Sequence, residues 1–533
     1  MSKHIVIVGG GIAGYLTALK AKKYYSAAAV TVISSDKIGI LGAGEGTTPT
    51  FLQTIVNCDV PIDRVFKETD ANFKLAVAFK GWSRKEDVYF HTFDELVCSN
   101  SLDKYMQPKN WCPSHSHGYV FSNIFDKNKL PPTFQTEQCL LTRAPLEFNK
   151  DRGLIDHDHN ASALHYDVGK MVKLLKDVAR EKYINIIDST LTDVKINTTG
   201  KVTDVVLDGG HTIPCDFVFD CTGFRRTVIS KVADKINKPL KFINTNNTLP
   251  VDSAIAYRMS HVGSSGNGPG PAKLRPYTIA RTLEHGWEWT ISVWSDLRKG
   301  YIYSSQSCTD EQAHEEVCEL YGKNIDVINK FKFDSGYLHD YWVNNCAAIG
   351  LAGGFFEPLE ATANNQISAQ VDFVLHNMFT DDTKHIENTN RAWREGMDTI
   401  HDFLVVHYTG CKSYDTNMWN HIRECKEIRD IAHKYIDRLC TSLYTIMADV
   451  FNMTKDPWKV FDDQRWLYVL GGTKQIPKTT DWLNFKSLQN EIFWNEVNEL
   501  GPGIKQFTSK LLDNTNACNL LRTGDPTRKY SYY

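Results

Sequence analysis

The stretch HIVIVGGGIAG, residues 4–14, decides the fold of the amino-terminal part of the chain. Its β-branched run IVIV is typical of a buried strand, and the glycines that follow predict a tight turn. After the turn, apolar residues recur at the spacing of one helix face, at Ile12, Leu16 and Leu19. A second β-branched run at residues 30–33 completes a strand–helix–strand unit, so we expect a parallel, doubly wound sheet.

The glycines of this turn match the GxGxxG pattern of dinucleotide-binding turns. The first permits the tight turn, the second lets the backbone approach a pyrophosphate, and the third allows close helix packing. A glycine-rich turn without a ligand is the alternative. We predict that the turn binds FAD, with the phosphates at the helix N-terminus and a serine where an acidic ribose ligand is usual. The residues predicted to bind the cofactor here are Gly9, Gly11, Ile12, Ala13, Gly14 and Ser34.

The rest of the pattern predicts an α/β protein with several parts. A helix is expected at residues 166–181, followed by a small antiparallel meander and a buried strand in residues 217–223 that rejoins the parallel sheet. Residues 245–345 indicate a mixed sheet on the substrate side, and the chain is mostly helical after Gln366, with one long helix at residues 422–451. The predicted class is thus a Rossmann-type FAD-binding doubly wound sheet, an antiparallel meander, a mixed substrate-side sheet and a largely helical C-terminal part.

We expect two domains from this pattern. Residues 1–364 form the FAD-binding core, into which substrate-side segments are inserted at about 90–160 and 245–345. Residues 365–533 form a mainly helical region packed on that core. The length of 533 residues is ample for such an arrangement.

Composition narrows the class of protein. The net charge of -3, with no basic stripe, argues against nucleic acid as a partner. The sequence contains no run of about 18 consecutive apolar residues, so no membrane span is expected. Thirteen cysteines without a CxxC pair are typical of reduced thiols, so a cytoplasmic protein is expected. Composition leaves an oligomer as open as a monomer.

Five further segments resemble the flavin-dependent tryptophan halogenase family. They are GAGEGTTPT (42–50), NFKLAVAF (72–79), FDCTG (219–223), GWEWTIS (286–292) and WVNNCAAIGLAGGFFEPLEAT (342–362), and HDFLVVHY (401–408) is similar beyond them. The resemblance implies that FADH2, O2 and halide generate hypohalous acid, which halogenates a small aromatic substrate. It also implies a separate NAD(P)H-dependent flavin reductase, because no second GxGxxG follows a strand and no NAD(P)H site is therefore expected.

The family's reactive lysine corresponds to Lys74. Strand alternation in NFKLAVAF places Phe73, Leu75, Val77 and Phe79 on one face and Lys74 beside small alanines on the other. A partly buried ammonium there would hydrogen-bond hypohalous acid or form a haloamine. The alternative is an ordinary lysine on the wet face of a strand, as Lys80 is expected to be.

A carboxylate and a helix start follow in FEPLEAT. By resemblance, Glu360 orients hypohalous acid or takes the ring proton, and Thr362 and Ala363 match the halide-binding positions. Glu360 is equally explained as a first-turn acid of a helix that begins near Pro358. The family has serine and glycine where this chain has Ala361 and Ala363, so halide choice and proton handling stay open.

The resemblance assigns two further groups. Trp287, Trp289 and Ile291 match the WxWxIP motif that lines the path between flavin and substrate, with Ser292 in place of proline; aromatic packing alone is the alternative. Gly44 and Glu45 match the strap over the flavin, and Leu351 matches a further cofactor contact.

We predict no metal site. The pairs His115/His117 and His157/His159 lack an accompanying ligand set and are expected to be surface or cleft histidines. From their region alone, Trp111, His115 and His117 are alternatively expected near the aromatic substrate. A flavin-dependent aromatic hydroxylase is the main alternative function and needs neither Lys74 nor Glu360. A non-catalytic FAD-binding scaffold is a third hypothesis, from another class.

Overall fold

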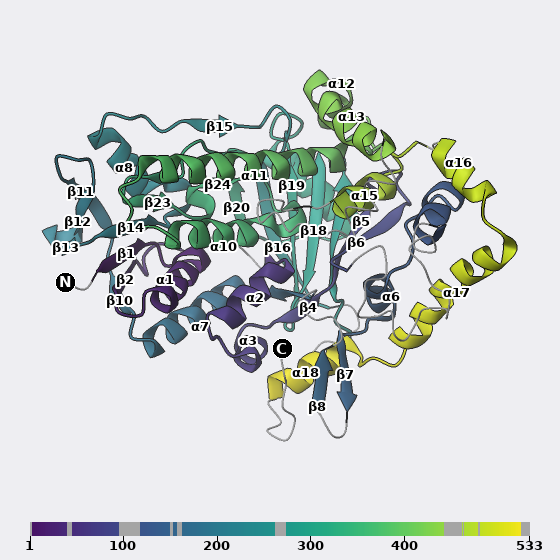
Figure 1. The fold of residues 1–533 in the computed structure, drawn as a ribbon, viewed down its shortest axis with the longest axis horizontal. Helices are drawn as coiled ribbons and strands as arrows, with labels where there is room; N and C mark the ends of the chain where they lie inside the picture. Colours follow the sequence, from purple (N-terminus) through teal and green to yellow (C-terminus); the bar gives the residue numbers. More distant parts are fainter. Residues whose placement is uncertain are drawn as a thin grey trace. The chain divides into compact units, whose positions relative to one another are not determined.

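The computed structural model groups the chain into two compact units, each built from three chain segments. It describes residues 3–39, 45–94, 118–149, 153–156, 162–261, 273–441, 461, 463–477 and 480–523. The first unit contains residues 1–71, 164–252 and 331–398, and the second unit contains residues 72–163, 253–330 and 399–533. Figure 1 shows the elements of both units along the chain. The domain boundary after residue 364 stays a prediction.

The first unit is organised around a six-stranded sheet of order β10-β2-β1-β14-β23-β22. Its strands are β1 His4–Val8, β2 Ala29–Ser34, β10 Asn185–Asp188, β14 Phe217–Asp220, β22 Trp342–Val343 and β23 Cys346–Ala348. Neighbouring strands from β10 to β23 are parallel, and only the short β22 pairs antiparallel. The doubly wound sheet and the return of β14 to it are therefore confirmed.

Helices cover this sheet because alternate β1 side chains point to opposite faces. Val6 and Val8 share one core cluster with Val228 and Ile229 of α8 (Thr227–Lys235) and with the valines of the meander. The meander consists of β11 Leu191–Ile196, β12 Val202–Leu207 and β13 Thr212–Pro214, as expected. The helices α1 (Ile12–Tyr24), α7 (Val168–Glu181) and α10 (Thr362–Leu375) also belong to this unit, and α1 packs against both α7 and α10.

At two positions, the turn between β1 and α1 leaves no space for any side chain. Gly9 has a φ of +127°, and a Cβ there would lie 2.2 Å from the carbonyl oxygen of Cys221. A Cβ on Gly14 would lie 1.9 Å from the carbonyl oxygen of Gly9. These two glycines let β1, α1 and the end of β14 approach one another at backbone distance.

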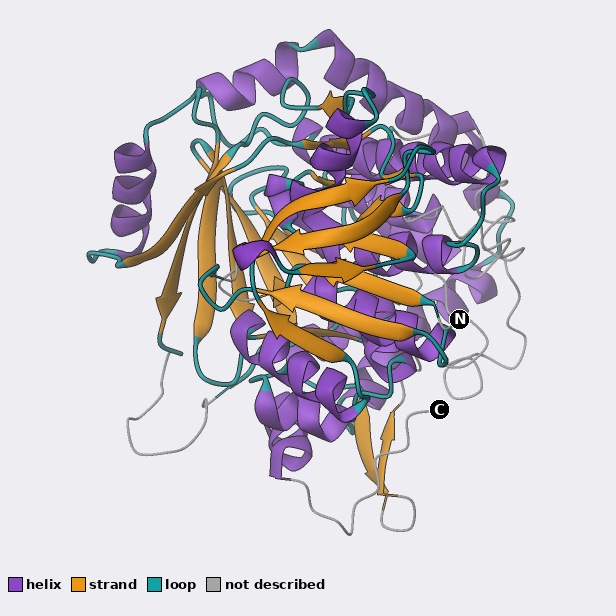
Figure 2. Cartoon of the chain, turned by 90° about the vertical axis from the view of Figure 1, so that its left-hand side faces the viewer, coloured by secondary structure: helices purple, strands orange, loops and turns teal. Residues whose placement is uncertain are grey.

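The second unit contains a seven-stranded mixed sheet of order β20-β16-β19-β18-β17-β5-β6, drawn among the orange strands of Figure 2. Its strands are β5 Ala76–Lys80, β6 Val88–Thr92, β16 Ser253–Met259, β17 Tyr277–Leu283, β18 Gly286–Ser292, β19 Leu297–Tyr303 and β20 Val327–Lys332. β17 pairs in parallel with β5, whereas the pairs β16–β19, β19–β18, β18–β17 and β5–β6 are antiparallel. The short β4 (Asn72–Lys74) precedes β5.

The remaining elements are mostly helices. They are α2 Pro49–Asn57, α3 Ile62–Glu68, α6 Phe134–Leu141, α9 Asp310–Tyr321, α11 Thr383–Thr409, α12 Asn417–Glu424, α13 Lys426–Thr441, α15 Asp463–Gly472, α16 Thr480–Ser487, α17 Glu491–Thr508 and α18 Asn514–Thr523, with a π-helix at Ser122–Asp126 and small strands β3 Glu45–Gly46, β7 Leu146–Asn149, β8 Gly153–Asp156, β9 Ala163–Tyr166, β15 Phe242–Asn244, β21 Gly336–Leu338 and β24 Gly354–Phe355. No helix in the described part of the chain is long and apolar enough to cross a membrane.

One predicted helix is divided in two. The pattern at residues 422–451 predicted a single helix, but α12 ends at Glu424 and α13 begins at Lys426. α13 does carry Ile428, Ile431 and Tyr435 of the predicted face, and residues 442–451 lie outside the described residues. Cys425 between them has extended backbone angles of φ -64° and ψ 118°, which break the helical hydrogen-bond series although the apolar periodicity continues.

Replacing Gly14 by alanine is expected to destabilise the protein by about 1 to 3 kcal/mol, because the new methyl group overlaps the Gly9 carbonyl. Denaturant unfolding of the purified protein measures this change. Gly11→Ala is the matched control, since a Cβ at Gly11 meets no atom within 4 Å. Equal stability of both variants would contradict the packing argument.

Candidate functional site

The first unit presents a cradle at the carboxyl ends of its parallel strands. The Gly9 N–H donates to the Ile33 carbonyl at 2.8 Å, and the Cys221 N–H donates to the Val8 carbonyl at 2.8 Å, so the ends of three strands lie at one edge. Ligands of doubly wound sheets bind at this edge. Gly11 faces open space and forms the N-cap of α1, so its backbone is free to approach a phosphate. The cradle thus fits a dinucleotide cofactor.

A second turn lies beside α1. Gly350 has a φ of +65°, and a Cβ on it would lie 3.0 Å from the Cβ of Ala13. Its N–H donates to Oε1 of Gln370 on α10 at 2.8 Å, which fixes the turn Gly350–Ala352. The tertiary structure therefore places Leu351 next to the GxGxxG turn, although they are far apart in sequence. Ser34 is buried at the end of β2, behind Gly10.

The strap residue Glu45 is held by two hydrogen bonds within the first unit. Its Oε2 accepts from the Tyr166 hydroxyl at 3.0 Å and from the Asn364 side-chain amide at 2.8 Å. Burial is the largest influence on the Glu45 carboxyl and raises its pKa. Because Asn364 lies in the first turn of α10, Glu45 is joined to the helix that carries the predicted halide residues. Gly44 lies outside the described residues.

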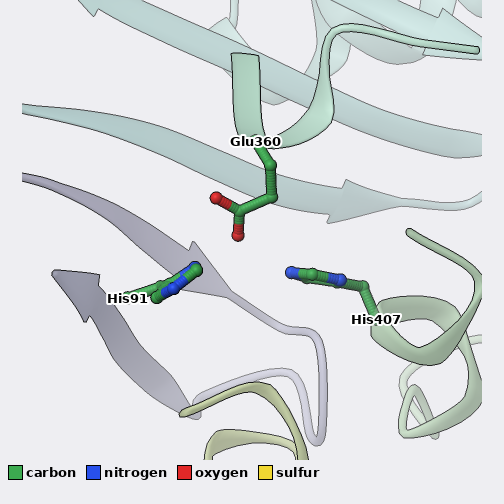
Figure 3. A group of neighbouring side chains, drawn as sticks. All are labelled: His91, Glu360 and His407. Atoms are coloured by element: carbon green, nitrogen blue, oxygen red, sulfur yellow. The ribbon is translucent and has the colours of Figure 1, made fainter. Parts of the chain in front are cut away.

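Glu360 lies in a strained turn before α10, not in its first turn. Its φ is +62°, and Ala361, the N-cap of α10, has a φ of +54°. The carboxyl-bearing side chain, 5% exposed, is drawn in Figure 3. A short 3-10 helix, Leu359–Ala361, does have Pro358 as its N-cap, but the positive φ of Glu360 interrupts it, and α10 begins only at Thr362. Thr362 and Ala363 are the first two helical residues, whose N–H groups have no intrahelical acceptor.

Lys74 is buried in the second unit, with 1% of its surface exposed. Its Nζ lies 5.3 Å from the centre of the Phe93 ring, within the range of a cation–π contact. The wet-face alternative is therefore wrong for Lys74, whereas Lys80 is only half-buried. A buried ammonium is costly to desolvate, which makes it a candidate for chemistry rather than solubility.

The predicted alternation around Lys74 breaks at Leu75. Leu75 separates β4 from β5 and packs with Ala76 and Cys139 in one cluster, so adjacent residues share a side. The Leu75 N–H donates to the Pro276 carbonyl at 2.8 Å instead of continuing a regular ladder. A strand interrupted in this way no longer follows the two-residue period that the sequence pattern assumed.

The tryptophan motif is tied to the Lys74 segment by one side chain. Nδ2 of Asn72 donates to the carbonyls of Ser292 and Arg275, each at 2.9 Å. Trp287, Trp289 and Ile291 are buried along β18. Trp289 lies over Gly300 of β19, where a Cβ would be 1.9 Å from the indole ring. Asn72 thus joins the segment that carries Lys74 to the end of β18, the strand of the tryptophan motif.

Two buried histidines of the second unit were missed by the sequence analysis. His91 on β6 and His407 on α11, both labelled in Figure 3, each have a ring nitrogen within 4.8 Å of the other's. The Phe403 ring contacts both, with centroids 5.9 Å and 4.9 Å away. Nδ1 of His407 donates to the Phe403 carbonyl at 2.8 Å. The resemblance of residues 401–408 to the family was a sequence signal that pointed to His407. No sequence signal pointed to His91 or Phe93.

The structure does not describe Trp111 or the two histidine pairs named in the sequence analysis. These pairs are His115/His117 and His157/His159.

Comparisons with known proteins agree with this geometry. A family model described as Tryptophan halogenase matches residues 4–486. Tryptophan 6-halogenase SttH of Streptomyces toxytricini is 27% identical over 439 residues, covering 78% of this chain and 80% of that protein. Tryptophan 7-halogenase RebH of Lentzea aerocolonigenes is 27% identical over 436 residues, covering 80% of this chain and 79% of that protein.

A solved structure shares the fold as well. BrvH, a flavin-dependent halogenase from Brevundimonas sp. BAL3, superposes with a TM-score of 0.80 at 21% identity, covering 98% of this chain and 99% of that chain. Since the family model spans most of its length, the chain belongs to the tryptophan halogenase family of flavin-dependent enzymes.

Proposed function

We propose that this enzyme uses FADH2, O2 and halide to make hypohalous acid and halogenates an electron-rich aromatic ring through Lys74. The observation that supports this most strongly is the burial of the Lys74 ammonium against Phe93. Indoles, phenols and pyrroles are the substrate class, and free tryptophan, on which the named relatives act, is one candidate.

FAD is the flavin that suits the cradle of the first unit. Its pyrophosphate would lie at Gly11, Ile12 and Ala13, and its ribose near Ser34. When bound and reduced, FAD would donate two electrons to O2 and halide would donate two more, so that O2 ends as water and hypohalous acid. A separate NAD(P)H-dependent flavin reductase would deliver the reduced FAD. We place the reaction in the cytoplasm, where the ten cysteines in the described part of the chain would stay as thiols.

Three groups divide the remaining chemistry. The first N–H groups of α10, at Thr362 and Ala363, bind halide without a charged side chain. The Lys74 amine holds hypohalous acid by a hydrogen bond, or exchanges an N–H for an N–halogen bond with release of water. Glu360 accepts the proton that the ring loses after electrophilic attack. The buried tryptophans of β18 line the path and exclude water.

Lys74→Ala is expected to lower halogenation by at least about 100-fold, because the group that holds the halogen donor is lost. The protein is incubated with FAD, NADH, a flavin reductase and each halide in turn, and products from indoles and phenols are measured by mass spectrometry. Lys80→Ala, on the neighbouring strand, is the control and should retain activity. Hydroxylated product would favour a monooxygenase, and flavin binding without any product would favour a scaffold.

Glu360→Gln keeps the size of the side chain but removes the proton acceptor, so kcat should fall by roughly 100-fold to 10,000-fold. Single-turnover product formation with reduced FAD measures this effect, and the FAD affinity serves as the internal control. An unchanged kcat would remove Glu360 from the proton step.

Gly11→Ala is expected to weaken FAD binding by about 10-fold or more while leaving stability within about 0.5 kcal/mol, since its methyl group enters the space assigned to pyrophosphate. Flavin fluorescence titration measures the dissociation constant. Unaltered affinity would place the pyrophosphate elsewhere.

A further inference from the structure

Side chains from two helices hold the backbone where the chain leaves β6. The Arg465 guanidinium on α15 donates to three consecutive carbonyls, those of Thr92 at 2.5 Å, Phe93 at 2.7 Å and Asp94 at 3.2 Å. Oε1 of Gln135 on α6 accepts from the N–H groups of Phe93 at 2.7 Å and Asp94 at 3.0 Å. We call Arg465 and Gln135 the exit clamp.

The clamp is itself anchored. The Asp94 carboxylate accepts from the Gln135 N–H and the Thr133 hydroxyl, each at 2.9 Å, at the start of α6. Burial is the largest influence on Asp94 and raises its pKa, while the nearby positive charge of Arg465 opposes that shift. Gln135 is fully buried. The Gln135 part of the clamp is therefore fixed by hydrogen bonds in a region of low dielectric constant.

This position is unusual because β6 is an edge strand. In the seven-stranded sheet β6 pairs only with β5, so its outer backbone groups need other partners. The clamp supplies them for the residues just after the strand. Phe93, held at both its N–H and its carbonyl, carries the ring that contacts the Lys74 ammonium.

The backbone of Phe93 also contacts the segment that carries Lys74. The Phe93 N–H makes a second, longer hydrogen bond to the Leu75 carbonyl at 3.3 Å, one residue after Lys74. A shift of the β6 exit would therefore move the Phe93 ring and loosen the irregular link between β4 and β5.

We propose that Arg465 and Gln135 are positioning residues of the halogenation site, which act through Phe93 on the placement of Lys74. This inference rests on the proposed function of Lys74. Arg465→Lys keeps the positive charge but removes the planar guanidinium that bridges several carbonyls. Gln135→Leu keeps the bulk of the side chain but removes the hydrogen-bond acceptor.

The test measures where the oxidised halogen goes. Wild type, Arg465→Lys, Gln135→Leu and Lys74→Ala are supplied with FAD, NADH, a flavin reductase and bromide, with indole and a freely diffusing 1,3-diketone trap in competition. Brominated indole and brominated trap are both quantified. Lys74→Ala defines the ratio for acid released into solution. Arg423→Leu is the matched control, because that arginine binds carbonyl and carboxylate groups near its own helix, away from β6.

We expect Arg465→Lys and Gln135→Leu to shift the ratio of indole to trap product toward the Lys74→Ala value by roughly 10-fold, as misplaced catalytic groups do. Total brominated product and FAD affinity should be retained. Folded variants that lower both products in equal proportion, or keep the wild-type ratio, would overturn the inference. Wild type that brominates neither compound would instead overturn the proposed function, and this inference with it.

Discussion

The backbone contact between Gly9 and Gly14 is the constraint on which the first unit depends. A side chain at either position would overlap a carbonyl oxygen, so only glycine allows α1 to start directly at the end of β1. That close start lets the helix N-terminus face the edge of the parallel sheet, where a phosphate is best stabilised. The turn at Gly350 and the helix α10 then pack against α1, so the position of the predicted halide residues at the start of α10 depends on the same contact.

The second unit depends on buried charge instead. Lys74 is enclosed beside Phe93, and on β18 the polar side chains alternate with the tryptophans. Lys299 donates to the Thr290 hydroxyl at 2.5 Å and lies 3.3 Å from the Glu288 carboxylate, and burial lowers its pKa. Such a network fixes strand register, because any slip would leave a charge without a partner. The tryptophan face is thus held in place from the opposite face of its strand.

The turn at Glu360 lies where the sequence differs from the motif expected by resemblance. Two consecutive residues without glycine's freedom, Glu360 and Ala361, take positive φ values, which are costly and persist only when the surroundings impose them. Asn364 joins this segment to Glu45 of the strap by a hydrogen bond. The loss of a serine and a glycine in this segment is therefore compatible with a rigid carboxylate, and the strain is concentrated at the proposed reactive residue.

The sequence by itself determined the Rossmann-type turn, the parallel sheet and the meander, because glycine sterics and apolar periodicity act over only a few neighbouring residues. It indicated the family through the resemblance of its motifs. It also indicated Lys74 and Glu360, but not their surroundings. Only the tertiary structure decided that Lys74 is buried, that Glu360 precedes its helix, and that the helical pattern after residue 422 breaks at Cys425. The contacts around the Lys74 segment, such as Asn72 with Ser292 and Arg465 with Phe93, join residues far apart in the chain, and no local pattern encodes them.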